Sequence, residues 1–121
     1  MQYRQLIKKV QDYSGFSDQE AEQSLHIIVE TLSARLQEGE RQDFASQLPS
    51  ELQDIALKPT GQEFFTHEDF YEQLSDIEGT TKAHVKKQLM AVWKALKEAA
   101  SPGELDDVKA QLPNSLAAEL H

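Results

Sequence analysis

This chain of 121 residues carries the same motif twice. The segments GERQDFASQLPSEL, which starts at Gly39, and GELDDVKAQLPNSL, which starts at Gly103, are identical at seven positions and stand 64 residues apart. The same shift places apolar residues on apolar residues along most of the chain, for example Leu25 on Leu89. A duplicated pattern of this kind predicts two similar structural units.

The spacing of the apolar residues predicts that each unit is helical. Between residues 3 and 13 they recur every three or four residues, which is the spacing of one face of an α-helix. A longer helix is expected over residues 21–36, after a capping box formed by Ser17 and Glu20. A third, short helix leads to Pro49, where the chain must turn because proline does not continue a helix.

We therefore expect an all-α fold, a compact helical bundle of two tandem three-helix units with short helices after Pro49 and Pro113. The two copies span residues 1–56 and 65–120, and a connector, residues 57–64, joins them within a single domain of residues 1–121. Each copy alone is small for an independent hydrophobic core. The copies are therefore expected to pack against each other around a pseudo-twofold axis.

Every residue of the repeated motif has a structural role in this prediction. The glycines are expected to end the long helices in the left-handed conformation, and the glutamates lie in the next first turn, where the helix dipole favours acids. The aspartates can reach back to the free amides, the glutamines can donate to carbonyls before the proline, and the leucines anchor the turn. The alternative is a repeated ligand site. The motif residues are Gly39, Glu40, Asp43, Gln47, Leu48 and Pro49, followed by Gly103, Glu104, Asp107, Gln111, Leu112 and Pro113.

Two tandem units that each open with Gly-Glu and close with Gln-Leu-Pro resemble the bacterial domain-of-unknown-function family numbered 2267. The segments ASQLP, from Ala45, and SPGELDDVKAQLP, from Ser101, carry the resemblance, which covers essentially the whole chain. The resemblance implies an all-helical fold and brings no assigned activity. In the second copy Lys109 stands where the first has Ala45, so no functional role is transferred to the alanines.

The composition argues against several classes of function. Twelve lysines and arginines against 21 aspartates and glutamates leave a net charge of −9, which repels nucleic acid. The chain has no cysteine, and therefore no disulfide and no thiolate-based metal or catalytic site. The N-terminal segment lacks the apolar run of a signal peptide, and no stretch has the length of a membrane span. We expect a cytoplasmic protein with no nucleic-acid and no membrane partner.

Side chains suited to chemistry are few and scattered. The four histidines include no pair spaced four residues apart, and no nucleophile motif occurs. The segment HEDF, residues 67–70, places two acids beside an imidazole, but the helix dipole alone explains acids at a helix start. We therefore predict no catalytic residues, no metal and no cofactor.

A lysine stripe is the first candidate for an interaction surface. Lys86, Lys87, Lys94 and Lys97 fall within about one third of the circumference of one helix. Either the stripe complements a neighbouring acidic helix of the same chain, or it docks an acidic partner. The dependence of partner affinity on salt would separate these alternatives.

Ile27 is the second candidate. It is expected on the outward side of the second helix, where a polar residue is usual. It is either an ordinary exposed residue, or it is covered by Phe64 and Phe65 near the connector or by a second chain.

These observations favour a non-catalytic helical protein–protein interaction or scaffold module, whose partner is another protein or a second copy of this chain. A small-molecule or metal-binding regulatory protein is the alternative, and an enzyme comes third. A tight cluster of titratable side chains in a dry pocket would favour the alternative. A smooth surface with an exposed apolar strip would favour the interaction module.

Overall fold

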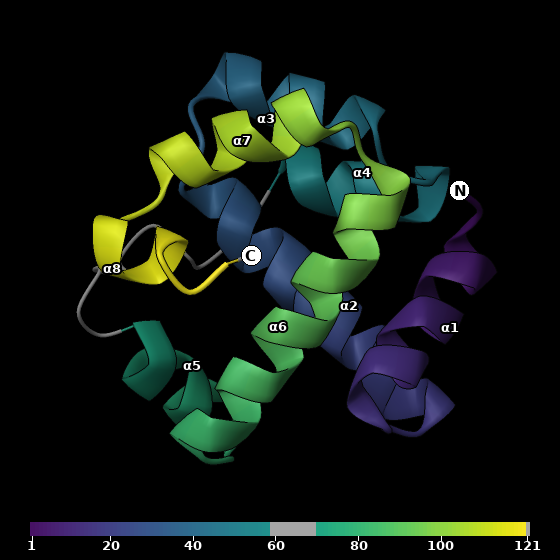
Figure 1. The fold of residues 1–121 in the computed structure, drawn as a ribbon, viewed down its shortest axis with the longest axis vertical. Helices are drawn as coiled ribbons and strands as arrows, with labels where there is room; N and C mark the ends of the chain where they lie inside the picture. Colours follow the sequence, from purple (N-terminus) through teal and green to yellow (C-terminus); the bar gives the residue numbers. More distant parts are fainter. Residues whose placement is uncertain (59–69, 121) are drawn as a thin grey trace.

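The computed structural model describes residues 1–58 and 70–120, and in these residues the chain forms helices and no strands (Figure 1). Seven of these helices have eight residues or more, and a single turn, α8, follows them. The predicted all-α class is confirmed. The elements are α1 (Tyr3–Ser14), α2 (Asp18–Ala34), α3 (Glu38–Ser46), α4 (Ser50–Leu57), α5 (Phe70–Glu78), α6 (Lys82–Ala99), α7 (Pro102–Gln111) and α8 (Asn114–Ala117).

The two long helices, α2 and α6, contact each other at the centre of the molecule (Figure 1). α1 packs against both of them, α4 packs against α2, and α5 packs against α6. α3 lies beside α4 and also beside α7, at the top of the view in Figure 1. The N-terminal helix is therefore held in place by a helix from the other half of the chain.

The starts of the long helices are fixed by hydroxyl caps. Ser17 Oγ accepts a hydrogen bond from the Glu20 amide at 3.1 Å, and Thr81 Oγ1 accepts one from the His84 amide at the same distance. A cap of this kind satisfies one of the amides that a helix leaves free at its first turn and contributes about 1 kcal/mol. The predicted cap at Ser17 is therefore present.

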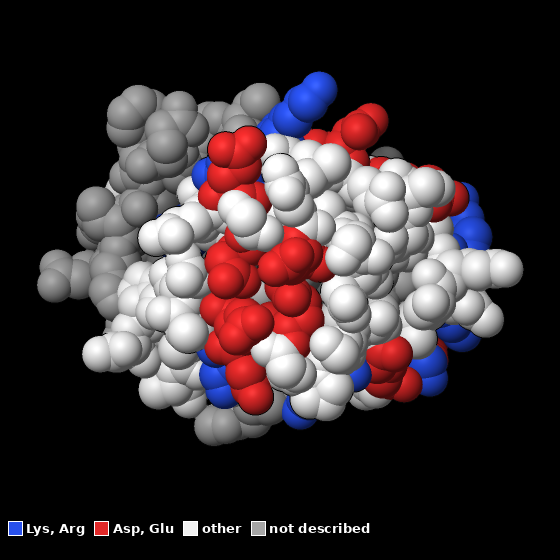
Figure 2. Space-filling model, turned by 90° about the horizontal axis from the view of Figure 1, so that it is seen from above, with Lys and Arg blue, Asp and Glu red and all other residues white. Residues whose placement is uncertain are grey.

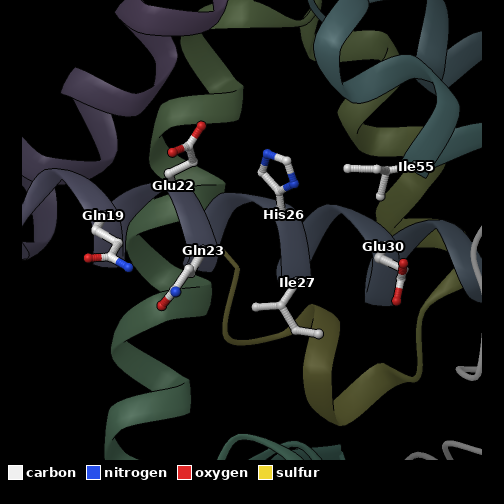
Figure 3. Close-up of a pocket in the computed structure, with 7 residues that line it drawn as sticks. All are labelled: Gln19, Glu22, Gln23, His26, Ile27, Glu30 and Ile55. Atoms are coloured by element: carbon white, nitrogen blue, oxygen red, sulfur yellow. The ribbon is translucent and has the colours of Figure 1, made fainter.

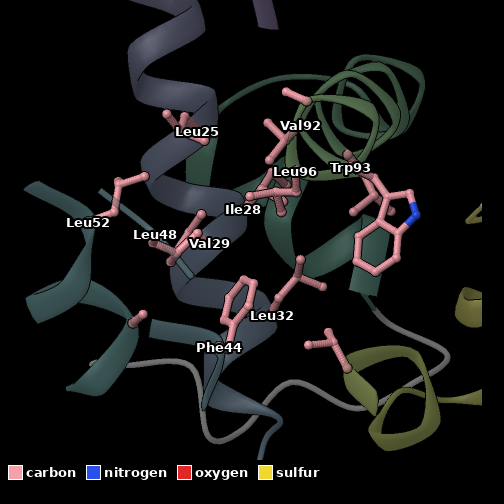
Figure 4. Close-up of a cluster of buried hydrophobic side chains, with 14 of the residues drawn as sticks. Leu25, Ile28, Val29, Leu32, Phe44, Leu48, Leu52, Val92, Trp93 and Leu96 are labelled. Carbon is pink, nitrogen blue, oxygen red and sulfur yellow. The ribbon is translucent and has the colours of Figure 1, made fainter. Parts of the chain in front are cut away.

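All seven helices from α1 to α7 contribute to the core, and one part of it lies between α2, α6 and α3 (Figure 4). Ile28 and Leu32 of α2 face Val92 and Leu96 of α6, and Phe44 of α3 closes the cluster; all five are fully buried. Burial of one such side chain stabilises a fold by about 1.5–3 kcal/mol. The apolar stripes of the two long helices thus supply much of the energy that holds the halves together.

The prediction that Gly39 and Gly103 end the long helices in a left-handed conformation is wrong. Each is the second residue of a short helix, α3 or α7. The described glycines with positive φ are Gly15, at 78°, and Gly79, at 67°. Gly15 directly follows α1, and Gly79 directly follows α5. A residue with a Cβ would be strained at either position.

A side chain replaces the glycine cap at the end of α2. The helix ends at Ala34, before the predicted position, and the Arg41 guanidinium donates to the carbonyls of Ser33 and Ala34 at 2.8 and 3.2 Å. Those carbonyls belong to the last turn of α2, where no later amide of the helix is available to donate to them. Since Arg41 satisfies them, no left-handed residue is needed there.

No helix in the described part of the chain combines the length and the apolar character needed to cross a lipid bilayer. Of the predicted connector, Leu57 is the last residue of α4 and Lys58 follows it. Residues 59–64 of the connector, together with Phe65, lie outside the described residues.

Candidate functional site

Carboxylates from the two copies of the motif meet where α3 and α7 lie side by side. Figure 2 shows a continuous acidic patch over this part of the molecule. Glu40 and Asp43 belong to α3, Glu104 and Asp107 belong to α7, and the charges of the other three act on Glu104. We term these four residues the acidic seam.

Glu104 is the most deeply buried member of the acidic seam, with 9% of its surface exposed. Its Oε1 atom and the Oε2 atom of Glu40 are buried and have no hydrogen-bond partner within the described structure. None of the ion pairs between described residues involves the seam carboxylates. Burial removes the water that would otherwise donate hydrogen bonds to these oxygens and supplies no other donor, which destabilises the folded protein.

Gln47 explains why the Glu104 carboxylate is left without a donor. In a complete capping box, Glu104 would accept a hydrogen bond from the amide of Ser101, the residue before α7. That amide donates instead to Gln47 Oε1 at 3.0 Å. Gln47 therefore accepts a hydrogen bond from the residue before α7, whereas we predicted that it donates to a nearby carbonyl. Gln53 Nε2 fills that role, since it donates to the Leu48 carbonyl at 3.1 Å.

Burial and like charge both raise the pKa of Glu104. Loss of hydration is the larger cause, and the carboxylates of Asp43, Glu40 and Asp107 add to it. Both causes disfavour the ionised form. The acidic seam is therefore a place where a proton or a cationic group lowers the free energy of the folded protein.

The second feature is a groove of about 460 Å³ beside α2 (Figure 3). Ile27 lines it and is partly buried against the core. The groove therefore combines apolar and polar groups. It is lined by Gln19, Glu22, Gln23, His26, Ile27, Glu30 and Ile55.

The Tyr3 hydroxyl joins two of the polar groups of this groove. It donates to Glu22 Oε2 at 2.5 Å and lies 2.5 Å from His26 Nε2. Because the single hydroxyl proton goes to Glu22, His26 Nε2 is the donor in the other contact. Burial, followed by the hydrogen bond to Glu22, raises the pKa of Tyr3. The tyrosine thus stays neutral and acts as a fixed hydrogen-bonding group.

Two lysines of the predicted stripe contact aromatic rings of the N-terminal half. Lys87 Nζ lies 5.3 Å from the centre of the Phe16 ring, and Lys94 Nζ lies 5.9 Å from that of Tyr13. A cation over a ring face at this distance is attracted to it by about 0.5–1 kcal/mol at an exposed site. Lys94 thus helps to hold α6 against α1, and Lys87 helps to hold α6 against the segment between α1 and α2.

The other two lysines of the stripe, Lys86 and Lys97, lie beside segments that follow α6 in the sequence. Lys86 Nζ is 3.7 Å from Glu119 Oε1, in an exposed ion pair. Lys97 lines a pocket of about 220 Å³ together with Trp93. All four lysines are exposed on α6, as predicted, but Lys86, Lys87 and Lys94 have partners within the same chain.

The remaining motif residues lie at helix boundaries or in the core. Pro49 and Pro113 stand immediately before α4 and α8. Leu48 and Leu112 are buried in the core, and Gln111 is the last residue of α7. In the described ranges, no three His, Asp or Glu side chains are arranged to hold a metal ion.

The sequence identified the acids of the motif but did not show that they lie close together. It also did not indicate that Tyr3 and Glu22 form a hydrogen-bonded pair beside the groove. The signal for the seam was present, because the repeat places Glu and Asp at the same spacing after each glycine. Nothing in the sequence showed that the two short helices lie side by side. Tyr3 gave no signal beyond its place in an apolar stripe.

The chain matches a known family over nearly its whole length. The family model described as "Uncharacterized conserved protein (DUF2267)" matches residues 3–119, which extends from the start of α1 to beyond α8. A search of curated proteins found no match.

Proposed function

The chain belongs to the DUF2267 family, and for it we propose a non-catalytic role as a helical module that binds another protein. The observation that carries the proposal is the acidic seam, which lies in a continuous acidic patch over α3 and α7 (Figure 2). A surface of one charge attracts partners of opposite charge and orients them during encounter. A basic protein is therefore the partner class that this surface favours.

The lysine stripe is a weaker candidate for the docking surface. The ammonium groups of Lys86, Lys87 and Lys94 already contact an acid or an aromatic ring of the same chain. An acidic partner would have to compete with those contacts. The acidic seam has no such competition from cations within the described residues.

Affinity capture from the native cell, followed by mass spectrometry, tests the proposal. The wild-type chain is compared with a variant that carries Asp43→Asn and Asp107→Asn, the two exposed acids of the seam. We expect a basic protein that the wild type retains and the variant loses, with an affinity for the purified partner that falls as salt rises. Retention of no protein above the background of a bare support would contradict the interaction role.

We also propose that the fold consists of two copies of one unit around a pseudo-twofold axis. Support comes from contacts between residues at equivalent positions of the sequence repeat. Gln88 Nε2 donates to Ser24 Oγ at 3.0 Å, and His84 Nε2 lies 3.7 Å from Glu20 Oε1. Residues near a twofold axis meet their own equivalents in this way. Superposition of residues 1–56 on 65–120 in a crystal structure would test the relation.

We propose a cytoplasmic location from composition alone. The absence of cysteine is compatible with a reducing compartment, where disulfides are of little use. Fractionation of the native cell with an antibody against the chain tests the location, and recovery from an exported or membrane fraction would contradict it.

A small-molecule regulator is the second candidate function, and the groove in Figure 3 favours it. Its volume of about 460 Å³ lies within the range of small-molecule pockets. The Tyr3 hydroxyl holds Glu22 and His26 in fixed positions beside it. A ligand screen by thermal shift, repeated with His26→Ala, tests this candidate; a ligand that stabilises both proteins equally would not occupy the groove.

A further inference from the structure

The two buried carboxylate oxygens of the acidic seam require a partner that the described part of the chain does not provide. Glu104 Oε1 and Glu40 Oε2 are both shielded from water and accept no hydrogen bond there. Glu104 as a whole is more than nine-tenths buried and lies within the field of the other three seam carboxylates. Buried acceptors normally have a donor, and a charged donor gives the strongest bond.

The chemistry of the seam indicates which donor fits. A divalent metal ion needs several oxygens that converge on one point at about 2.0–2.6 Å. No three acids of the described residues are arranged in that way. An arginine guanidinium carries five N–H donors in a planar fork, so it can reach two carboxylates at once, and it loses its weak hydration more readily than an ammonium group does.

As a refinement of the proposed interaction role, we propose that the acidic seam binds an arginine of a partner protein, whose guanidinium lies between the Glu40 and Glu104 carboxylates. The guanidinium donates to the carboxylates of both helices, and its charge offsets their mutual repulsion. Asp43 and Asp107 are exposed beside them and attract the basic residues on either side of that arginine.

Fluorescence anisotropy with the full chain tests the proposal. The probe is a labelled peptide in which arginine alternates with glycine, and two further peptides replace arginine with lysine or with its uncharged isostere, citrulline. The seam variant is Glu40→Gln with Glu104→Gln. The matched control is Glu51→Gln with Asp54→Asn, which removes the same charge from two exposed positions of α4.

We expect the seam variant to bind the arginine peptide at least about tenfold more weakly, and the control variant to differ from wild type by less than about twofold. The lysine peptide should bind more weakly than the arginine peptide, and the citrulline peptide should show no saturable binding. The seam variant should unfold at a temperature no lower than wild type, because it removes repulsion, and this measurement excludes misfolding as the cause of lost binding.

Three results would overturn the proposal. An equal loss of affinity in the seam and control variants would mean that binding depends on the net charge of the protein and not on the seam. Equal affinity for the lysine and the arginine peptides would show that the seam does not recognise a guanidinium group. Displacement of the peptide by calcium chloride, beyond the effect of sodium chloride at equal ionic strength, would make the seam a metal site.

Failure here is distinguishable from failure of the interaction role. If the capture experiment retains a partner that the Glu40→Gln, Glu104→Gln variant retains equally well, the chain is an interaction module that uses another surface. If the arginine peptide binds at the seam but no cellular protein is retained, the site recognises arginine and the interaction role is contradicted.

Discussion

Gln88 Nε2 donates a hydrogen bond to Ser24 Oγ over 3.0 Å, and so links α6 to α2 inside their apolar interface. The two side chains are 3% and 0% exposed. Gln88 Nε2 also donates to Glu78 Oε1 at 2.9 Å, at the end of α5. A slip of one long helix along the other would break the hydrogen bond between Gln88 and Ser24 inside the interface, so this contact favours one alignment of the two helices.

Replacement of Gln88 by alanine should lower the free energy of unfolding by about 2–3 kcal/mol, because it removes two hydrogen bonds and leaves a small cavity. Ser24→Ala should cost about 1 kcal/mol. Chemical denaturation of both variants and of the double variant measures these values. We expect the double variant to be more stable than the sum of the single losses implies, and strict additivity would mean that the two side chains are not coupled.

Glu104→Gln should raise the free energy of unfolding at pH 7 by about 1 kcal/mol, the size of effect typical of a buried polar group without a partner. The folded protein raises the pKa of Glu104 above its ordinary value of 4.5. The native state therefore holds the proton more tightly than the unfolded chain does. The contribution of Glu104 to stability is fully present below pH 4.5 and is lost as pH rises through the folded pKa.

Thermal unfolding of wild type and Glu104→Gln across this pH range gives the check. The difference between the two stabilities should grow in favour of the variant as pH rises. Asp107→Asn, which changes an exposed acid of the same seam, is the control and should show a smaller difference. A constant difference at all pH values would show that Glu104 titrates normally.

Gly39→Ala and Gly103→Ala should each stabilise the protein by about 0.5–1 kcal/mol. Both glycines lie in helices, and an added Cβ meets no atom within 4 Å at either position. Alanine restricts the unfolded chain more than glycine does and is compatible with helical geometry. Gly15→Ala is the matched control and should destabilise, because Gly15 has φ of 78°. Melting temperatures of the three variants test this, and a loss at all three positions would contradict it.

A fragment that comprises residues 1–58 should not fold cooperatively. α1 packs against α6, and the Tyr13 hydroxyl donates to Glu98 Oε2 at 2.5 Å near the end of that helix. Without α6, the apolar side chains of α1 and α2 lose much of their cover, and fewer than 60 residues bury too little surface to compensate. Circular dichroism during urea titration tests this, and a sharp transition in a monomeric fragment would be the contrary result.

The helices and their apolar faces were predictable from the sequence, because periodic spacing reports which side of a helix is buried. Leu25, Ile28 and Leu32 are examples, and all three are fully buried. The ends of the helices were less predictable. Gly39 was predicted to be a C-terminal cap because glycine often follows the last residue of a helix. The last carbonyls of α2 are instead satisfied by the side chain of Arg41, which belongs to the next helix, α3.

The candidate site was only half predictable. The repeated acids at Glu40 and Glu104 were visible, and their place in a first helical turn was correct. Their burial depends on contact between α3 and α7, and Glu104 lacks a donor because the Ser101 amide donates to Gln47 instead. Contacts of this kind arise from tertiary packing, and local sequence carries no record of them.

The packing of α1 against α6 also determines when the protein can fold during its synthesis. α1 is translated well before α6, and α6 covers part of its apolar face. At roughly 5–20 residues per second, the interval lasts on the order of ten seconds. Throughout that interval α2 can cover only part of the apolar face of α1, which includes Leu6 and Val10, both fully buried in the finished fold. A holding chaperone that recognises such a stripe would therefore act before α6 has emerged and would have nothing to bind afterwards.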